Sequence, residues 1–314
     1  MTETGRPQAL PMSNPRADRV RNIARLAGRP ARLRRRQFLA EGPQAVREAL
    51  AAHRERITAG GAGLVREVYA SPAVLDRLPE LADLCRDTEL RLATDEVLAA
   101  LSDTVQTQGI VAVCDFLDQD LGAVLARSPK LVAVLCQVRD PGNAGTVLRA
   151  ADAAGADAVV FTSSSVDIYN PKAVRSTAGS LFHLPVVLGA ETEDLVAAFR
   201  GAGIGVLAAD GYGSLDLDLL QDESAARRLT GSDTPSAFNL EAPTAWLFGN
   251  EAQGLSETEL ALSDHRVAVP VYGAAESLNV GTAATVCLYA SARAQQHRSP
   301  DRAHRPGAAG QPGA

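Results

Sequence analysis

Residues 131 to 161 alternate apolar runs with a helical pattern. Leu131–Cys136 (LVAVLC) is an apolar run of strand length, and its valine content favours a buried strand. The next segment predicts a turn at 141–143, followed by a helix over Ala144–Ala154 that ends at Gly155. A second apolar run at 157–161 (DAVVF) predicts another strand. The order strand, turn, helix and strand is typical of an α/β domain.

Three polar residues, Arg139, Asp140 and Asn143, follow the first of these strands. In open α/β sheets, ligands usually bind at this end of the strands. The turn contains neither the GxGxxG of dinucleotide binders nor the GxxxxGK[ST] of P-loops. A glycine run at 201–205 precedes a predicted strand rather than following one, which favours a tight loop. The hydrophobic pattern therefore predicts a ligand site without identifying the ligand.

The remaining chain continues this alternation and predicts two α/β domains. Residues 221–242 are polar without a pattern, which predicts an exposed loop or insertion. The polar ends of the chain are expected to be disordered. The predicted boundaries are a tail at 1–15, a first domain at 16–117, a helical linker at 118–130, a second domain at 131–295 and a tail at 296–314.

Composition sets further bounds. The chain has 314 residues, of which 46% are hydrophobic, enough to bury two cores. No run reaches the roughly 18 apolar residues of a membrane helix, and the N-terminus lacks the apolar segment of a secretory signal. We therefore expect a cytoplasmic protein with no membrane partner. The cysteines form no CxxC pair and lie mostly in apolar runs, which favours buried thiols over a zinc site, so no metal is expected: Cys85, Cys114, Cys136 and Cys287.

Charge is distributed unevenly along the chain. The net charge of −6 by itself argues against a nucleic-acid binder. Residues 16–36, however, carry one acid, Asp18, and nine arginines, at positions 16, 19, 21, 25, 29, 32, 34, 35 and 36. Further along, Lys172 and Arg175 are three residues apart and would share one face of a helix. Each cluster fits phosphate contacts or a solvated helix face, and charge alone leaves both open.

Two later stretches complete a set of motifs. Residues 244–255 (TAWLFGNEAQGL) predict a strand that ends in a glycine-flanked carboxylate, and residues 267–280 (VAVPVYGAAESLNV) a strand and loop before a small-residue helix. The three motifs DPGNAGTVLRAADAAG, LFGNEAQGLS and VPVYGAAESLNVGTAA thus stand in order along the chain. In these motifs the chain resembles the SpoU (TrmH-like) family of S-adenosylmethionine-dependent RNA ribose 2′-O-methyltransferases, within the SPOUT superfamily.

The resemblance implies an α/β architecture in which an N-terminal L30e-like substrate-binding domain precedes a trefoil-knotted SPOUT methyltransferase domain. It also implies a homodimer. The segment RRRQFLAEGPQAVREAL is similar to the start of the ribosomal-protein-L30e-like domain, which would put Arg35, Arg36 and Glu41 near RNA. Family members carry a similar PK-x-x-R stretch, so RNA contact is the expected role of Lys172 and Arg175. Nothing in the periodicity shows the knot, and knots are rare among folds.

Methyl transfer to a ribose needs a group that favours the alkoxide, because a hydroxyl is a weak nucleophile near neutral pH. The resemblance assigns this role to Arg149, with Asn143, Glu251, Ser277 and Asn279 as the other catalytic residues. Since the pKa of arginine stays very high, positioning and oxyanion stabilisation fit Arg149 better than proton abstraction, although the sequence leaves both open. By residue type alone, Asn143 and Ser277 would be helix N-caps and Glu251 a solvated turn acid.

Spacing adds an expectation for two pairs of these residues. Asn143 and Arg149 are six residues apart, or about 240° around a helix axis, which favours Asn143 in the turn before the helix. Ser277 and Asn279 are two apart and fit a loop–helix junction better than a regular helix.

The cofactor site is expected around the second motif. Gly249 and Gly254 allow close backbone approach on either side of Asn250. The resemblance implies that S-adenosylmethionine is the cofactor and that backbone near Gly249, Val269 and Leu278 holds its adenosine part.

The predicted function is therefore 2′-O-methylation of a ribose in structured RNA. Ribosomal RNA is favoured over transfer RNA, because an L30e-like domain usually binds folded RNA shape. One alternative is a catalytically silent RNA-binding or ribosome-assembly protein, and another is a nucleotide-dependent oxidoreductase, which the missing glycine fingerprint disfavours. The target nucleotide, and the choice between housekeeping modification and self-protection against an antibiotic, are left open by the sequence.

Overall fold

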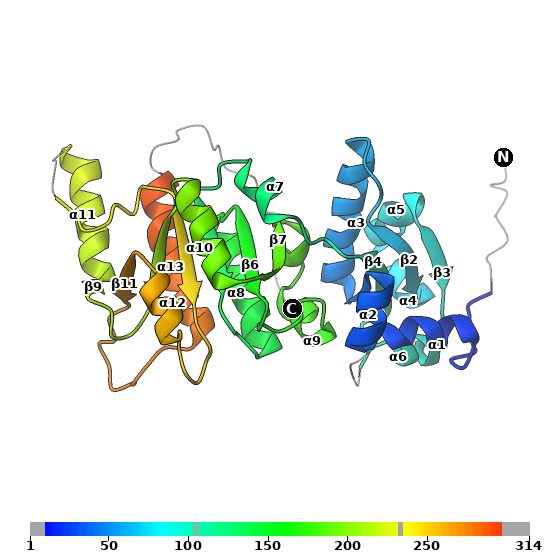
Figure 1. The fold of residues 1–314 in the computed structure, drawn as a ribbon. Coiled ribbons are helices and arrows are strands. Elements are labelled where there is room, and N and C mark those ends of the chain that lie inside the picture. Colours follow the sequence, from blue (N-terminus) through cyan, green and yellow to red (C-terminus); the bar gives the residue numbers. More distant parts are fainter. Residues whose placement is uncertain (1–9, 103, 105, 232–234, 297–314) are drawn as a thin grey trace.

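The computed structural model describes residues 10–102, 104, 106–231 and 235–296. Within them the chain forms two units that lie side by side, each around its own sheet (Figure 1). The N-terminal unit contains a four-stranded sheet and the C-terminal unit a seven-stranded sheet. This architecture confirms the α/β class predicted from the alternating apolar runs.

The sheet of the N-terminal unit has the strand order β1-β4-β2-β3. β4 runs antiparallel to β1 and β2, while β2 and β3 are parallel. The strands are β1 (Gln37–Glu41), β2 (Val65–Ala70), β3 (Glu89–Leu92) and β4 (Ile110–Asp115). The helices are α1 (Asp18–Ala24), η1 (Arg25–Ala27), α2 (Arg29–Arg35), α3 (Pro43–Thr58), α4 (Pro72–Arg77), α5 (Pro79–Leu84), η2 (Cys85–Asp87) and α6 (Asp95–Leu101).

Alternation along β1 sends side chains to two helical layers, because successive residues of a strand face opposite sides of the sheet. Phe38 and Ala40 pack in one cluster with Val46 of α3. Leu39, between them, packs in another cluster with Val20 of α1 and with α6. The sheet is therefore covered on both faces.

The segment before α1 also contacts this unit. Met12 forms an isolated parallel bridge with Ala93, and its N–H donates to the carbonyl of Leu92 at 2.8 Å. The structure thus differs around Met12 from the disordered tail expected at 1–15. Residues 1–9, and the tail expected from 297 onward, lie outside the described residues.

The C-terminal unit is a parallel sheet with the strand order β7-β6-β5-β10-β8-β11-β9. The strands are β5 (Leu131–Leu135), β6 (Ala158–Thr162), β7 (Val186–Ala190), β8 (Gly205–Ala209), β9 (Leu215–Asp216), β10 (Thr244–Phe248) and β11 (His265–Ala268). The helices are α7 (Leu121–Leu125), α8 (Pro141–Ala154), α9 (Pro171–Ser176), η3 (Ser180–Phe182), α10 (Thr192–Gly201), α11 (Leu217–Thr230), α12 (Glu257–Leu262) and α13 (Val280–Gln296).

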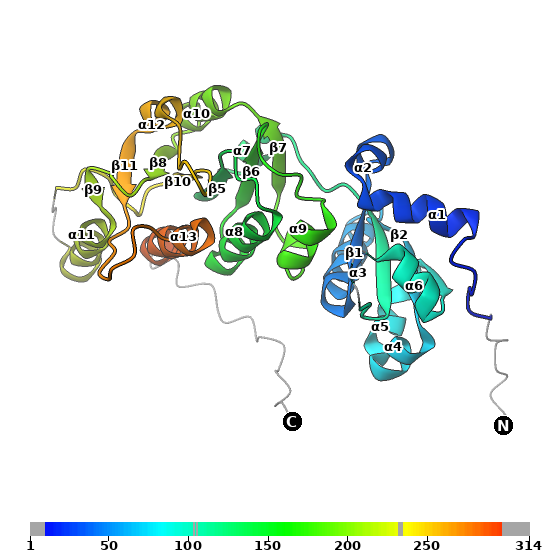
Figure 2. The same cartoon turned by 90° about the horizontal axis from the view of Figure 1, so that it is seen from below.

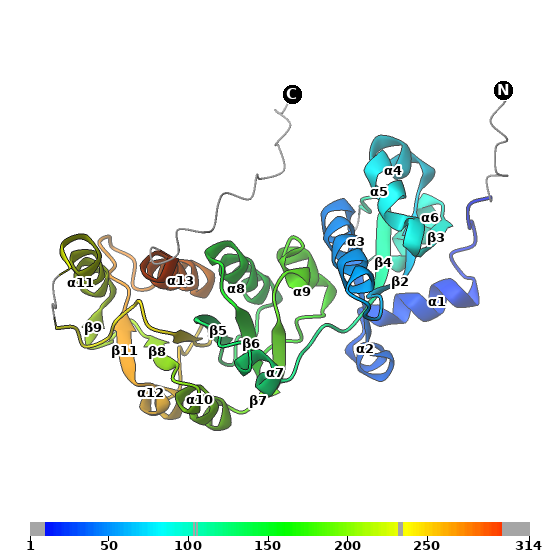
Figure 3. The same cartoon turned by 90° about the horizontal axis from the view of Figure 1, so that it is seen from above.

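Helices cover both faces of this parallel sheet. Figure 2 shows α8, α9, α11 and α13 on one side and α10 and α12 on the other, and Figure 3 shows the same layers from the opposite direction. Every residue of β5, β6 and β10 is buried. A strand covered on both faces has no polar side, which explains why these segments are continuous apolar runs in the sequence.

The turn predicted at 141–143 is wrong, because these residues form the first turn of α8. Asp140 is the N-cap, and its side chain accepts a hydrogen bond from the N–H of Asn143 at 2.9 Å. Proline is well suited to the first helical position, where its missing N–H would have no intrahelical partner. Pro141-Gly142 therefore starts a helix instead of preceding one.

The loop predicted at 221–242 is also wrong for its first part. α11 continues to Thr230 and ends at Gly231, which has a φ of 67°. Leu217, Leu220 and Ser224 are its buried residues, three and four positions apart on one stripe. Of these three residues only Ser224 lies beyond position 221, so the stretch from 221 to 230 carries no buried apolar stripe that would predict a helix. Residues 232–234 lie outside the described part of the chain.

All four cysteines are buried and unpaired, as predicted. Burial raises the pKa of each thiol. Among the described residues, no helix is long and apolar enough to cross a membrane. The same part of the chain contains no cluster of His, Cys, Asp and Glu side chains that could hold a metal ion.

The two units share an aromatic core as well as a linker. The ring centroid of Tyr169, before α9, lies 3.9 Å from that of Phe116 and 4.8 Å from that of Phe38. The hydroxyl oxygen of Tyr169 accepts the N–H groups of Leu117 at 2.6 Å and Asp118 at 2.9 Å. The N-terminal unit is therefore held against α9 by buried contacts.

Arg32 forms a second bond between the units and is only 2% exposed. Its Nε and Nη2 donate to one oxygen of Asp167, at 3.1 and 2.8 Å, and its Nη1 donates to the carbonyls of Leu26 and Ala27 at 2.9 and 2.6 Å. One of the nine arginines of the basic block is thus a structural residue that RNA cannot reach.

His183 bridges the units through two carboxylates. Its Nδ1 lies 2.7 Å from Asp152 of α8, and its Nε2 lies 3.3 Å from Glu48 of α3. The hydrogen bond to Asp152 is the main cause that raises the pKa of His183 from its ordinary 6.5 to about 9, and Glu48 adds to it. The imidazole is therefore charged in the folded protein at neutral pH.

We expect His183 to stabilise the protein below about pH 6.5 and to lose this effect toward pH 9. Because its pKa is raised on folding, the contribution of the charged ring to the free energy of unfolding is complete below the unfolded-state pKa and disappears as the pH rises through the folded-state pKa. Denaturant unfolding of the wild type and His183→Gln across this range would measure the effect. The difference between the two proteins should shrink as the pH rises, and a constant difference would contradict the assignment.

Candidate active site

The site is built around the start of α8, which follows the carboxyl end of β5. Besides capping the helix, Asp140 accepts a hydrogen bond from Lys172 of α9, with Nζ 2.9 Å from its Oδ2. The Lys172 ammonium is the main cause that lowers the pKa of Asp140, followed by the N–H of Asn143. A charged carboxylate therefore fixes the position of Asn143 at neutral pH.

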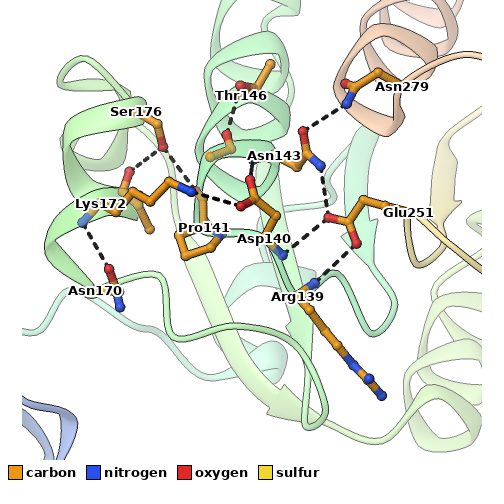
Figure 4. A network of polar contacts seen from close by, with 12 residues as sticks. Arg139, Asp140, Pro141, Asn143, Thr146, Asn170, Lys172, Ser176, Glu251 and Asn279 are labelled. Carbon is orange, nitrogen blue, oxygen red and sulfur yellow. Dashed lines mark hydrogen bonds and ion pairs between the residues drawn. The ribbon is translucent and has the colours of Figure 1, made fainter.

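Glu251 brings the second motif onto this helix start (Figure 4). Its Oε1 accepts from the Asn143 side-chain amide at 3.0 Å and from the N–H of Asp140 at 3.3 Å, and its Oε2 accepts from the N–H of Arg139 at 3.5 Å. Three donors converge on one carboxylate that follows β10. Glu251 thus has defined partners and is more than a solvated turn acid.

Asn279, from the third motif, contacts the other end of the Asn143 side chain. Its Nδ2 donates to the Oδ1 of Asn143 at 3.0 Å, while its own Oδ1 accepts the N–H of Gly281 at 2.9 Å and so caps α13. Asn143 is therefore held at both ends of its amide, by Glu251 and by Asn279. The structure brings together three of the five predicted catalytic residues.

The glycine-flanked loop after β10 is tightly folded. Asn250 and Gly254 exchange two backbone hydrogen bonds, at 2.9 and 2.8 Å, and Gly254 has a φ of 70°. The side chain of Asn250 donates to the carbonyl of Gln137 at 2.9 Å, which ties the loop to the end of β5. A Cβ at Gly249 would lie 2.2 Å from the carbonyl carbon of Gly254. The close backbone approach predicted for this loop is therefore between Gly249 and the main chain of Gly254, two parts of the same loop.

Replacing Gly249 by alanine should therefore displace the loop. The added methyl group meets main chain, which cannot rotate away as a side chain could. We expect at least a tenfold loss of S-adenosylmethionine affinity, on the order of 1.4 kcal/mol, measured by isothermal titration calorimetry. Gly201→Ala is the matched control, because a Cβ at the end of α10 meets nothing within 4 Å. Equal affinities for the two variants would contradict a cofactor role for the loop.

Among the described residues, no hydrogen bond or ion pair joins this cluster to the side chains of Arg149, Ser277, Val269 or Leu278. Arg149 is exposed on α8, and no side-chain contact joins it to Asn143 or Glu251 in the described part of the chain. Ser277 is exposed just before α13, at the loop–helix junction predicted from spacing. Val269 follows β11, packed partly against the core, and Leu278 is half-buried.

The predicted RNA contacts already have partners within the chain. Arg36 binds Asp118 at 2.8 Å and lies 5.0 Å from the ring centroid of Phe116. Arg35 donates to a backbone carbonyl at 3.1 Å, and Arg175 binds Glu41 at 3.3 Å. Their exposed surfaces remain open to phosphate, and an RNA role stays a prediction.

Sequence reasoning placed Asp140 at the ligand end of the strand but assigned it no function, although it orders both Asn143 and Lys172. The available signal was an Asp directly before Pro141, since an Asp N-cap with Pro at the first helical position is a common helix start. The pairing with Lys172 joins residues 32 positions apart and had no local signal.

Comparison with known proteins matches both units. Residues 130–289 match the model described as the SpoU rRNA Methylase family, and residues 17–112 match the MRM3-like substrate binding domain. The chain is 31% identical over 271 residues to the 23S rRNA (guanosine(2553)-2′-O)-methyltransferase RlmP of Bacillus subtilis, covering 86% of this chain and 94% of that protein. It is 33% identical over 219 residues to a 23S rRNA (uridine(2479)-2′-O)-methyltransferase of Streptomyces viridochromogenes, covering 68% and 70%.

Solved structures agree over most of the chain. The AdoMet-bound SpoU methyltransferase AviRb of Streptomyces viridochromogenes aligns with a TM-score of 0.71 at 30% identity, covering 88% of this chain and 98% of that chain. An AdoMet-bound rRNA methyltransferase from Sinorhizobium meliloti aligns with a TM-score of 0.71 at 25% identity, covering 90% and 97%. The likeness therefore extends over both units.

Proposed function

The chain belongs to the SpoU rRNA methylase family, and from this premise we propose its reaction. It transfers a methyl group from S-adenosyl-L-methionine to a ribose 2′-hydroxyl of ribosomal RNA. The observation that carries the proposal is the hydrogen-bonded chain Glu251–Asn143–Asn279, which joins all three motifs at one end of the sheet. A protein that only bound RNA would have no need of this arrangement.

The folded loop after β10 fits the cofactor. Its backbone is fixed by the paired hydrogen bonds of Asn250 and Gly254, and the absence of a side chain at Gly249 lets it pack against the main chain of Gly254 and Leu255. Gly249, Asn250, Gly254, Val269 and Leu278 would hold the adenosine part. When bound, the cofactor supplies an electrophilic methyl group, and the residues of the chain bind and orient the ribose that receives it.

The remaining residues act on the ribose. Arg149 would orient the hydroxyl and the neighbouring phosphate and stabilise the developing oxyanion, because a guanidinium offers five N–H donors and no acceptor. Asn143 and Asn279 would form the edge of the ribose site, in a geometry that Glu251 fixes, and Ser277 would border it from the loop before α13. Such fixed donors cost no reorganisation as charge develops.

We also propose that the enzyme is a cytoplasmic homodimer with the trefoil knot of its superfamily. Val286 and Tyr289 of α13 are 38% and 49% exposed and lie three residues apart, so they present one apolar stripe outward. A second copy packed on this stripe would cover it and approach the exposed face of α8. Light scattering at micromolar concentration tests the dimer, and a Val286→Glu variant should be monomeric.

The reaction is tested with pure protein, labelled S-adenosylmethionine and unmodified 23S ribosomal RNA, with transfer RNA in parallel. We expect one labelled 2′-O-methyl site in the 23S RNA, mapped by its resistance to alkaline hydrolysis. Tight RNA binding without any label would overturn the enzyme assignment and favour a silent RNA-binding protein. Label in transfer RNA alone would overturn the choice of substrate.

A further inference from the structure

The carboxylate of Asp140 joins α8 to the neighbouring helix α9. Its Oδ1 accepts the N–H of Asn143 at 2.9 Å, and its Oδ2 accepts the ammonium of Lys172 at 2.9 Å (Figure 4). The two oxygens thus have different partners, one inside α8 and one on α9. The backbone N–H of Asp140 donates to Glu251 at 3.3 Å, to the same oxygen that accepts the Asn143 amide. Asp140 is therefore part of the network that joins the motifs.

Gly142, in the first turn of α8, leaves room for this contact. A Cβ at Gly142 would lie 2.8 Å from the Oδ1 of Asp140 and 3.9 Å from the Cε of Lys172. A side chain at this position would press on the carboxylate and reach the stem of the lysine. The geometry of the pair therefore depends on a residue that has no side chain.

Lys172 reaches Asp140 from a helix that packs directly against α8. Gly145 of α8 permits this approach, because a Cβ there would lie 1.8 Å from the Oγ of Ser176 at the end of α9. The same hydroxyl donates to the carbonyl of Pro141 at 3.1 Å, one residue after the N-cap of α8. The ammonium is thus presented by a helix that is bonded to the start of α8.

Helix α9 is also fixed from its other side, by the N-terminal unit. Arg175 donates to Glu41 of β1 at 3.3 Å, and the Glu41 side chain is only 6% exposed. Tyr169, two residues before the helix, packs on Phe116 of the same unit. A helix held by both units gives the lysine a defined position.

We propose that Lys172 and Asp140 are positioning residues for methyl transfer, which hold Asn143 in the geometry that the reaction needs. Lys172 then acts on α8, in contrast to the RNA contact expected from the sequence. Both side chains are partly exposed, and such ion pairs add little to stability. A displacement of about 1 Å from the reacting geometry can nevertheless cost about 100-fold in rate. The inference rests on the proposed function for the reaction whose rate it affects.

The test uses the full chain and a 23S ribosomal RNA transcript, and it compares kcat with RNA affinity measured without turnover. For Asp140→Ala we expect kcat to fall by about 10- to 100-fold, because Asn143 loses the acceptor that fixes its N–H. Asp140→Asn should restore the part of kcat that depends on the cap, since asparagine caps a helix about as well as aspartate. Both variants should keep the wild-type KM for RNA and the wild-type affinity for S-adenosylmethionine.

Lys172→Met removes the ammonium and keeps most of the aliphatic stem. We expect kcat to fall by about three- to tenfold, to the level of Asp140→Asn, with the KM for RNA unchanged. The slope of log RNA affinity against log salt should also stay unchanged, whereas loss of one phosphate contact on a single strand would reduce it by about 0.7. Adding Lys172→Met to Asp140→Ala should lower kcat no further, because the two residues act through one contact.

Two matched variants control for the loss of a cap and the loss of a lysine. Asp216 caps α11 by accepting the N–H groups of Asp218 and Leu219 at 2.8 and 3.3 Å, so Asp216→Ala removes a similar cap from another helix. Lys130 is the only other lysine of the chain, and it is exposed just before β5, at the opposite end of that strand from α8. Asp216→Ala and Lys130→Met should both keep the wild-type kcat.

Wild-type kcat in Lys172→Met would overturn the positioning role, as would a raised KM for RNA with a reduced salt slope. An equal loss of kcat in Asp216→Ala would overturn it as well. The cap itself is followed without the reaction by NMR, since hydrogen exchange of the Asn143 amide should be faster in Asp140→Ala than in the wild type. Faster exchange with an inactive wild type would refute the proposed function and support the positioning of Asn143. An active wild type with unchanged kcat in both single variants would do the reverse.

Discussion

Replacing Arg149 by alanine should lower kcat for methyl transfer by about 100- to 1,000-fold, the range found when one oxyanion donor is removed. The fold should tolerate the change, because Arg149 is exposed on α8 and has no side-chain partner in the described residues. Surface substitutions of this kind usually change the free energy of unfolding by no more than about 0.5 kcal/mol. Turnover of labelled cofactor on 23S RNA, alongside cofactor affinity by calorimetry, separates the two effects.

Arg139→Ala is the matched control. Arg139 is also exposed and close to the site, but its guanidinium points away from the Glu251–Asn143–Asn279 cluster, and only its backbone N–H contacts Glu251 (Figure 4). Its loss should leave kcat within a few-fold of wild type. Unchanged turnover in Arg149→Ala would remove Arg149 from the mechanism.

The lysine variant distinguishes the two roles left open for Arg149. A lysine ammonium has an ordinary pKa of about 10.4, whereas a guanidinium loses its proton only at a far higher pH. If Arg149 abstracts a proton, the rate of Arg149→Lys should rise about tenfold per pH unit up to that pKa. If it only donates, the rate of the variant should be low and nearly independent of pH.

Replacing Arg32 by methionine should destabilise the protein by about 3–5 kcal/mol, the range found when one partner of a buried ion pair is removed. Asp167 would be left with an uncompensated charge, and the carbonyls of Leu26 and Ala27 would lose their donor. Denaturant unfolding at pH 7, monitored by circular dichroism, measures this loss.

Arg36→Met provides the control, since Arg36 forms an exposed ion pair with Asp118, and such pairs contribute at most about 1 kcal/mol. Adding Asp167→Asn to Arg32→Met should recover part of the stability, because the buried charge is then removed. A loss below about 1 kcal/mol in Arg32→Met would show that the pair does not hold the units together.

The fold was predictable where burial is continuous. Apolar runs at 131–136 and 157–161 appear as β5 and β6, because a strand between two helical layers has no polar positions. The helix start at Pro141 and the helix at Leu217–Thr230 were missed. The first helix start depends on the Asp140 cap, and the second helix depends on a narrow stripe of three buried residues. Each feature involves few residues of an otherwise polar segment.

The site was predictable only through its motifs. Asn143, Glu251 and Asn279 meet across 108 and 136 residues of chain, and no local pattern relates them. The same holds for Arg32 with Asp167, 135 residues apart. Charge alone placed Arg32 in a basic block that fitted either phosphate contacts or a solvated helix face, whereas tertiary packing buries its side chain. Contacts of this range depend on topology, which local propensity does not encode.

The aromatic contact between Phe38, Phe116 and Tyr169 bears on how such enzymes acquire new targets. A target-selecting module on a flexible tether can be exchanged between enzymes by recombination at the tether. Here an exchange at 118–130 would leave Tyr169 and Asp167 facing a foreign surface. A working chimera would have to carry the residues before α9 along with the N-terminal module. Drift to a new RNA is thus easier by substitution within the existing module than by replacement of it.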